Sequence, residues 1–366
     1  MRQGDLKVPF RLPLLIMGFM SLVAGVGSGL LRLGWEVSLP SAELVLLHGP
    51  LMVCGFLGTV IGLERAVALG RRWAYAGPLL TGLGGLILIS GYSQALGAAA
   101  MALGSCVLLT GSLLIAWRQR ELFTVTMALG AASWLAGNLL WLAGVPVAHV
   151  VALWINFLVL TIAGERLELT RFLSPSANAK RTFAVILIML LAGGVMVPVS
   201  AGAMLYGAGL LALALWLLRY DIARRTVKGE GLTRFIAVCL LSGYAWLVAG
   251  SLILLDAASA PTAMSLAGAS YDAVLHAILI GFVFSMVFGH ALVIFPSVVR
   301  VKMPYHWTFY LPLLALHLSL MIRLWGDILS MPQLRSTGGL LNAAALVLFV
   351  MSVIASVIRG FRAAKK

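Results

Sequence analysis

The chain has 366 residues, of which 61% are hydrophobic and 10% are charged, and its mean hydropathy is +1.04. Apolar runs of 18 or more residues recur from end to end, which excludes a soluble globular protein and predicts an all-α, polytopic transmembrane bundle. The net charge of +14 must be compared with membrane topology before nucleic acid is considered as a partner. The three cysteines stand singly within apolar runs, so the sequence indicates neither a disulfide framework nor a zinc site.

Twelve membrane spans are predicted, and they form one integral membrane domain over residues 1–366. The first apolar run follows three basic residues, but it is too long for a typical signal peptide and shows no clear cleavage site, so we interpret it as a span. The predicted spans are 10–33, 42–63, 73–93, 95–117, 122–144, 147–169, 181–203, 204–220, 235–256, 270–297, 307–325 and 338–358.

The basic residues are distributed very unevenly between the two sides of these spans. With the N-terminus inside, 23 of the 26 Lys and Arg residues fall on the inner side, and the exceptions are Arg32, Arg323 and Arg335. This pattern predicts that both termini are cytoplasmic and that the protein lies in the inner membrane of a bacterium. Anionic membrane lipid is a sufficient partner for the net charge, and no nucleic acid is expected.

A repeat follows from this topology. The second, sixth and tenth spans each begin outside and carry a histidine in their first turns, namely His48, His149 and His276. In the second and sixth spans the histidine is followed, after 15 residues, by a Glu-Arg pair. This spacing predicts three quasi-equivalent four-helix units. The units cover about 10–117, 122–220 and 235–358.

The histidines of the second and tenth spans are the best candidates for ligands. His48 and His276 lie five to six residues inside their spans, where a polar group is costly unless it is paired. We therefore expect them to ligate a haem iron near the outer side. Asp272 precedes His276 by one turn and is a candidate partner for its ring, or else it is a solvated helix end. His149 lies nearer the edge of its span and is either a third metal ligand or an interfacial histidine.

Two further histidines lie deeper in the predicted membrane. On a continuous α-helix, the 14 residues from His276 to His290 advance about 21 Å and turn about 1400°, which places both rings on nearly one face. His290 and His317 form a second candidate ligand pair, or they tie neighbouring helices together by hydrogen bonds.

The remaining candidates are charged residues near span ends. Each Glu-Arg pair is either a snorkelling arginine with a local ion pair, or a proton entry point or helix-end clamp. Arg32, at an outer end, either binds a haem propionate or is an ordinary interfacial charge. The two pairs are Glu64-Arg65 and Glu165-Arg166.

Two stretches carry a family resemblance, HGPLMVCGFLGTVIGLERAVAL and HAILIGFVFSMVFGHALVIFPSVV. They resemble the NnrS family of twelve-span proteins linked to nitric oxide metabolism, and the architecture distantly resembles haem-copper oxidase subunit I. The resemblance implies haem b, with copper as a second candidate. It also implies a small gas ligand such as nitric oxide and a redox partner protein in nitric oxide or respiratory metabolism.

The sequence departs from the oxidases in ways that put a complete haem-copper site in doubt. The seventh span contains no histidine, and no tyrosine follows His149 within its span. Whether the protein is an oxidoreductase therefore stays open. A transporter or permease without a cofactor is the main alternative, and a purely structural membrane subunit is a third. Motifs for nucleophilic or phosphoryl chemistry have no plausible context.

Overall fold

The computed structural model describes residues 5–38, 40, 42–259 and 268–363. The described residues are mostly helical and contain no strand, and twelve of their helical spans are long and apolar enough to cross a membrane. The predicted all-α, polytopic class is therefore confirmed, and the protein is a multi-pass membrane protein. Three of the Lys and Arg residues assigned to the inner side lie outside the described residues, namely Arg2, Lys365 and Lys366.

The chain divides into two compact units. Unit 1 comprises Met1–Gly164 and Ser297–Arg300, and unit 2 comprises Glu165–Pro296 and Val301–Lys366. These boundaries do not coincide with those of the three predicted four-helix units. The three-unit repeat stays a prediction from the sequence.

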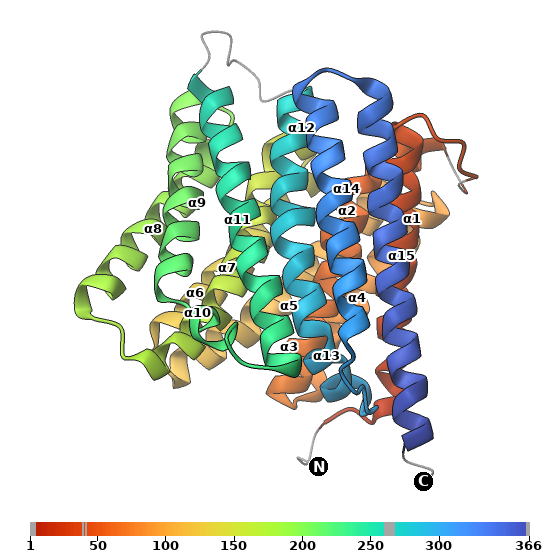
Figure 1. The fold of residues 1–366 in the computed structure, drawn as a ribbon. Helices are drawn as coiled ribbons and strands as arrows, with labels where there is room; N and C mark the ends of the chain where they lie inside the picture. The colour runs from red at the N-terminus through yellow and green to blue at the C-terminus, as the bar shows by residue number, and fades with distance from the viewer. Residues whose placement is uncertain (1–4, 39, 41, 260–267, 364–366) are drawn as a thin grey trace. The chain divides into compact units, whose positions relative to one another are not determined.

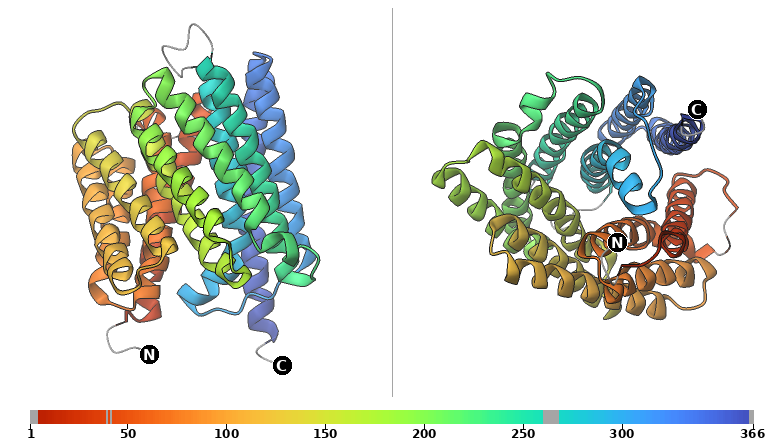
Figure 2. Two further views of the ribbon diagram at one scale, coloured as in Figure 1. Left: turned by 90° about the vertical axis from the view of Figure 1, so that its left-hand side faces the viewer. Right: turned by 90° about the horizontal axis from the view of Figure 1, so that it is seen from below.

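Unit 1 is built from helical hairpins in which α4 packs beside α5 and α5 beside α6 (Figure 2). The connection between α4 and α5 is tight because Gly91 takes a φ of +69° and the Ser93 hydroxyl accepts the Leu96 N–H, which caps α5. Its elements are η1 (Val8–Phe10), α1 (Leu12–Arg32), η2 (Ala42–Leu47), α2 (His48–Pro50), η3 (Leu51–Leu57), α3 (Gly58–Leu69), η4 (Arg72–Tyr75), α4 (Ala76–Ser90), α5 (Gln94–Arg118), α6 (Leu122–Leu142) and most of α7 (Val147–Thr170).

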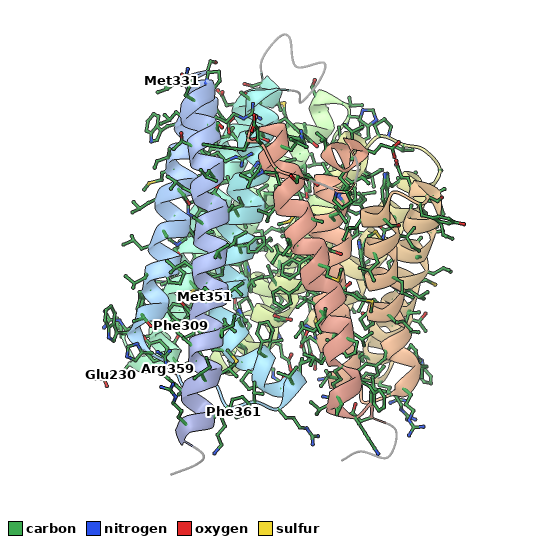
Figure 3. The ribbon with its side chains drawn as sticks, turned by 90° about the vertical axis from the view of Figure 1, so that its right-hand side faces the viewer. Glu230, Phe309, Met331, Met351, Arg359 and Phe361 are labelled. Atoms are coloured by element: carbon green, nitrogen blue, oxygen red, sulfur yellow. The ribbon has the colours of Figure 1, made fainter. Side chains whose placement is uncertain are left out.

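Unit 2 contains the longest of the described helices, α15, which packs side by side with α14 (Figure 1). Met351 and Phe361 of α15 are both 58% exposed (Figure 3), as expected of side chains that face lipid. Its elements are the end of α7, η5 (Arg171–Leu173), α8 (Ala177–Met196), α9 (Ser200–Tyr220), α10 (Ala223–Thr226), α11 (Gly231–Ser259), α12 (Ala269–His276), η6 (Ala277–Phe284), most of α13 (Ser285–Val299), η7 (Trp307–Phe309), α14 (Tyr310–Ile328) and α15 (Pro332–Ala363).

Two of the described spans contain a π-helical segment. In each of them a π-helical segment, η3 or η6, follows a histidine: His48 lies three residues before η3, and His276 directly precedes η6. The span of His149, α7, is α-helical throughout. A π-helix pairs residue i with i+5 and so has more residues per turn than an α-helix, and such segments are frequent at functional sites.

The π-helical segment corrects one expectation from the sequence. His276 and His290 were predicted to share a face because 14 residues of α-helix make nearly four turns. The eight residues of η6 lie between them and turn less per residue, so the α-helical spacing does not hold. The two rings accordingly have different surroundings.

A polar cluster at the N-terminal end of unit 1 anchors the chain. Arg11 is 2% exposed and donates to the Asp5 carboxylate at 2.6 Å and to the Val298 carbonyl at 3.0 Å. The Tyr75 hydroxyl donates to the other Asp5 oxygen at 2.6 Å. Partial burial raises the pKa of Asp5, but the Tyr75 hydrogen bond and the Arg11 charge outweigh it, so the pKa lies below the usual 3.8.

This cluster should make stability depend on pH at the acid end. A carboxyl whose pKa is lowered by folding stabilises the protein above its unfolded pKa of 3.8, and the contribution is lost as pH falls through the folded pKa. We expect Asp5→Asn to reduce the free energy of unfolding by about 1 kcal/mol at pH 6, since solvent screens the pair. Thermal unfolding of both proteins in detergent checks this. The difference should shrink below pH 3.8, and a constant difference would contradict the assignment.

Candidate functional site

His276 lies at the end of α12 in a buried, charged environment within unit 2. The residue is 9% exposed, and its Nδ1 lies 2.8 Å from the main-chain carbonyl of Asp272, one turn earlier. The same nitrogen lies 3.4 Å from the Asp272 carboxylate. Asp272 is therefore the neighbour of His276 that the sequence predicted. It is itself only 9% exposed, so the alternative of a solvated helix end is wrong.

Asp272 joins His276 to two arginines from other helices. Its Oδ2 is 2.8 Å from Nη2 of Arg323 on α14 and 3.3 Å from Nη2 of Arg335 on α15. Nε of Arg335 lies 2.9 Å from the carboxylate of Asp327, which is 3% exposed. We call these five residues the outer cluster. Its two carboxylates and two guanidiniums balance in charge, which is how a buried charged group is tolerated.

His48 occupies a comparable local position in unit 1. Its Nδ1 lies 2.7 Å from the carbonyl oxygen of Gly25 on α1. The ring packs so closely on α1 that a Cβ at Gly29 would lie 2.9 Å from both Cε1 and Nδ1. A glycine at position 29 therefore allows the imidazole to lie against the helix.

The hydrogen bonds of these two histidines fix their chemistry. A carbonyl oxygen only accepts, so Nδ1 must carry the proton and donate it, and in the neutral ring Nε2 is the nitrogen with the lone pair. The same reasoning applies to His290, whose Nδ1 lies 2.8 Å from the Met286 carbonyl. Metal-bound histidines usually have this arrangement, because the hydrogen bond at one nitrogen orients the other toward the metal.

His317 is held at both of its ring nitrogens. Its Nδ1 accepts the indole N–H of Trp246 at 2.9 Å, and its Nε2 lies 3.0 Å from the Ser242 hydroxyl. Both ring nitrogens are thus engaged with α11. This arrangement is the helix tie that the sequence offered as the alternative to a second ligand pair.

Four of the other predicted residues belong to unit 1. His149 is exposed at the start of α7, and Arg32 is exposed at the end of α1. Arg65 pairs with its neighbour Glu64 at 3.3 Å, and both are partly exposed. These positions agree with the simpler alternative in each case. His149 is an interfacial histidine, Arg32 is an interfacial charge, and Glu64 and Arg65 form a local ion pair.

The Glu165-Arg166 pair behaves differently from Glu64-Arg65. Arg166 is 3% exposed, so it does not snorkel, and its Nε lies 3.7 Å from the Asp221 carboxylate. Asp221 also accepts the Tyr244 hydroxyl at 2.5 Å. A second polar cluster of unit 2 is thus formed by Arg166, Asp221 and Tyr244.

The comparison with protein families identifies the family of this chain but does not assign an activity to it. A model of a family described as a domain of unknown function, DUF8744, matches residues 11–358, nearly the whole chain. The chain belongs to the DUF8744 family. No curated protein matches the sequence significantly.

A site for a metal ion held by protein alone is not formed in the described part of the DUF8744 chain. No group of three or more His, Cys, Asp or Glu side chains is placed there to hold an ion. The geometry of the described residues does not support the predicted metal site of His48, His149 and His276. It gives no support for a copper site either. A haem supplies four nitrogen ligands of its own and needs only one or two imidazoles.

Sequence reasoning missed Asp327 and both arginines of the outer cluster, Arg323 and Arg335. A signal for both arginines was present, because they are two of the three cations that violate the positive-inside pattern. An arginine on the unfavoured side of a span end needs a compensating anion. Asp272 and Asp327 were among the acidic residues near the outer ends of the predicted spans.

Proposed function

We propose that the protein is a haem-binding integral membrane protein and that His276 and His48 are candidate imidazole ligands of haem b. The observation that carries the proposal is the hydrogen bond from Nδ1–H of each ring to a main-chain carbonyl. That bond sets the tautomer in which Nε2 is the ligand nitrogen. Each histidine also directly precedes or lies close to a π-helical segment, a feature common at functional sites.

The surroundings of His276 support its role as the stronger candidate of the two. A buried imidazole next to a carboxylate is a better electron donor, because the carboxylate strengthens the Nδ1–H dipole. Asp272 stands 3.4 Å from that nitrogen and is kept in place by Arg323 at 2.8 Å. Bound haem would supply one-electron or gas-binding chemistry, and this chain would orient the ring and set its basicity.

The finer assignment rests on the sequence resemblance. Likeness to the NnrS family supports a role in nitric oxide or respiratory redox metabolism, with a small gas as ligand and a protein as redox partner. The charge distribution supports the bacterial inner membrane. Copper is not part of the proposal.

The haem content of the purified full-length protein tests the proposal. After expression with added haem precursor, we expect at least one haem b per chain by the pyridine haemochrome assay, matched by iron analysis. A preparation that is folded by circular dichroism but holds neither iron nor a Soret band would contradict the proposal.

A transporter without a cofactor is the second candidate, favoured by the buried Arg166–Asp221 pair and the Tyr244 hydroxyl beside it. Buried ionisable groups in membrane helices often mark ion or proton pathways. Haem-free protein that takes up a substrate, with uptake lost in Asp221→Asn, would favour this function over haem binding.

A further inference from the structure

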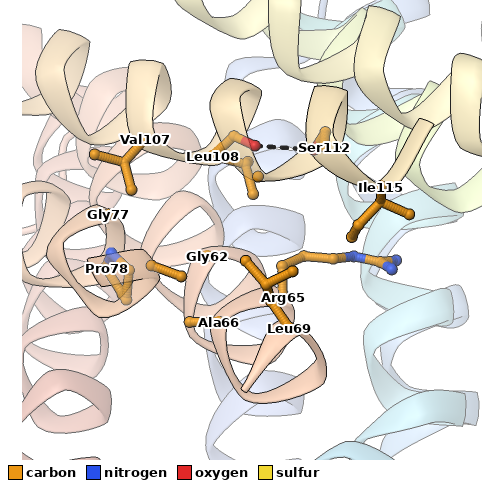
Figure 4. A pocket seen from close by; sticks show the side chains of 12 residues that line it. Gly62, Arg65, Ala66, Leu69, Gly77, Pro78, Val107, Leu108, Ser112 and Ile115 are labelled. Atoms are coloured by element: carbon orange, nitrogen blue, oxygen red, sulfur yellow. Dashed lines mark hydrogen bonds between the residues drawn. The ribbon is translucent and has the colours of Figure 1, made fainter. Parts of the chain in front are cut away.

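A shallow groove lies on unit 1 between α3, α4 and α5, near the ends of α3 and α5 that carry the arginines (Figure 4). Its cavity volume is only about 30 Å³, so an occupant lies along the groove and is not enclosed by it. Small residues from all three helices form its floor, among them Gly62, Gly77 and Gly111. The Ser112 hydroxyl donates to the Leu108 carbonyl of its own helix at 2.9 Å, which leaves the groove wall apolar.

One charged side chain stands at this apolar groove. Among the described residues that line it, Arg65 alone is charged, and Figure 4 shows its guanidinium extending past Leu69 toward Ile115 of α5. Arg65 contacts Glu64 at 3.3 Å through Nε, but a guanidinium has five N–H donors and can serve more than one acceptor. The groove thus combines an apolar floor with a cationic rim.

The ends of the same helices carry exposed arginine and tryptophan side chains. Arg71 and Arg72 precede α4, and Arg118 ends α5; all three are exposed. Trp73 is 41% exposed and Trp117 is 71% exposed, and tryptophan favours the membrane–water interface. The groove therefore lies where an acyl chain passes into a headgroup region, and the charge there favours an anionic headgroup.

We propose that this groove binds one anionic glycerophospholipid, with an acyl chain across Gly111 and the phosphate at Arg65. Charge complementarity decides the headgroup, since Arg65, Arg71, Arg72 and Arg118 are all cationic. Because the groove is shallow, the apolar part of the ligand must be a flexible chain that lies along it. The inference does not depend on haem binding.

Two matched pairs of variants test the site in the full-length protein. Arg65→Gln removes the cation at the groove, and Arg72→Gln removes one that does not line it. Gly111→Leu fills the groove, since a Cβ there meets only Leu69 and Trp73 at an ordinary 3.7 Å. Thr110→Leu adds a similar side chain at the exposed neighbouring position of α5. Native mass spectrometry of protein with dioleoylphosphatidylglycerol or dioleoylphosphatidylcholine measures lipid binding.

We expect the wild type to retain phosphatidylglycerol in preference to phosphatidylcholine. Arg65→Gln should bind phosphatidylglycerol about fivefold more weakly, while Arg72→Gln should lose much less, because Arg72 does not line the groove. Gly111→Leu should reduce binding of both lipids relative to Thr110→Leu, and this comparison decides the matter even if Arg65→Gln does not fold. Equal binding of the two lipids by the wild type, equal losses in the two arginine variants, or full binding by Gly111→Leu would overturn the proposal.

Discussion

Replacement of His276 by alanine is expected to reduce the haem content of the purified protein at least tenfold. The reason is that His276 presents Nε2 as a ligand while its Nδ1 donates to the Asp272 carbonyl at 2.8 Å. Loss of even an outer partner of a metal ligand costs about 10- to 100-fold in affinity, so loss of the ligand itself costs no less. Haem per chain by the pyridine haemochrome assay, with folding checked by circular dichroism, measures the effect.

Two other histidines provide matched controls for this experiment. His306 lies outside the spans and its Nδ1 contacts the Thr308 hydroxyl at 3.0 Å, and His317 has both ring nitrogens engaged. We expect His306→Ala and His317→Gln to keep the haem content of the wild type. A loss of haem in either control equal to that in His276→Ala would show that the assay reports general destabilisation. Unchanged haem in His276→Ala would exclude it as a ligand.

Replacement of Asp272 by asparagine is expected to destabilise the protein by about 3 kcal/mol. Asp272 is the anion shared by Arg323 and Arg335, and removal of one partner of a buried ion pair leaves the others uncompensated. The exposed Asp256, on α11 of the same unit, offers the control Asp256→Asn. That substitution removes the same charge from a solvent-exposed position and should reduce the free energy of unfolding by less than about 0.5 kcal/mol.

Thermal or chemical unfolding in one detergent compares the two aspartate variants. The variant Asp272→Asn should also change the position of the visible haem bands, because the carboxylate near Nδ1 sets the basicity of His276. Equal stability of Asp272→Asn and Asp256→Asn would contradict the structural role of the outer cluster. A stability loss without any spectral change would keep that role and remove Asp272 from the haem site.

The sequence predicted the spans well because the membrane imposes a simple rule on length and hydropathy. The predicted span 147–169 is observed as Val147–Thr170, and 204–220 as Ser200–Tyr220. The π-helical segments η3 and η6 were not predicted, since their residues are as apolar as those of an α-helical span. A prediction that depended on 3.6 residues per turn, the common face of His276 and His290, failed for this reason.

The candidate site was predicted only in part, because partners across helices leave no local pattern. Asp272 was found as a neighbour of His276 because the two are four residues apart on one helix. Arg323 and Arg335 come from α14 and α15, and only their unusual side in the topology marked them. The burial of Arg166 was missed because Asp221, its partner, lies 55 positions away in the chain.

The reduced-minus-oxidised visible spectrum of the purified protein tests the central claim most directly. For wild-type protein we predict the sharp α and β bands of a low-spin haem b with two nitrogen ligands from the protein. In His276→Ala we predict that these bands disappear, while His306→Ala retains them. A wild-type spectrum without any haem band, or a His276→Ala spectrum identical to that of the wild type, would contradict the assignment of His276 as a haem ligand.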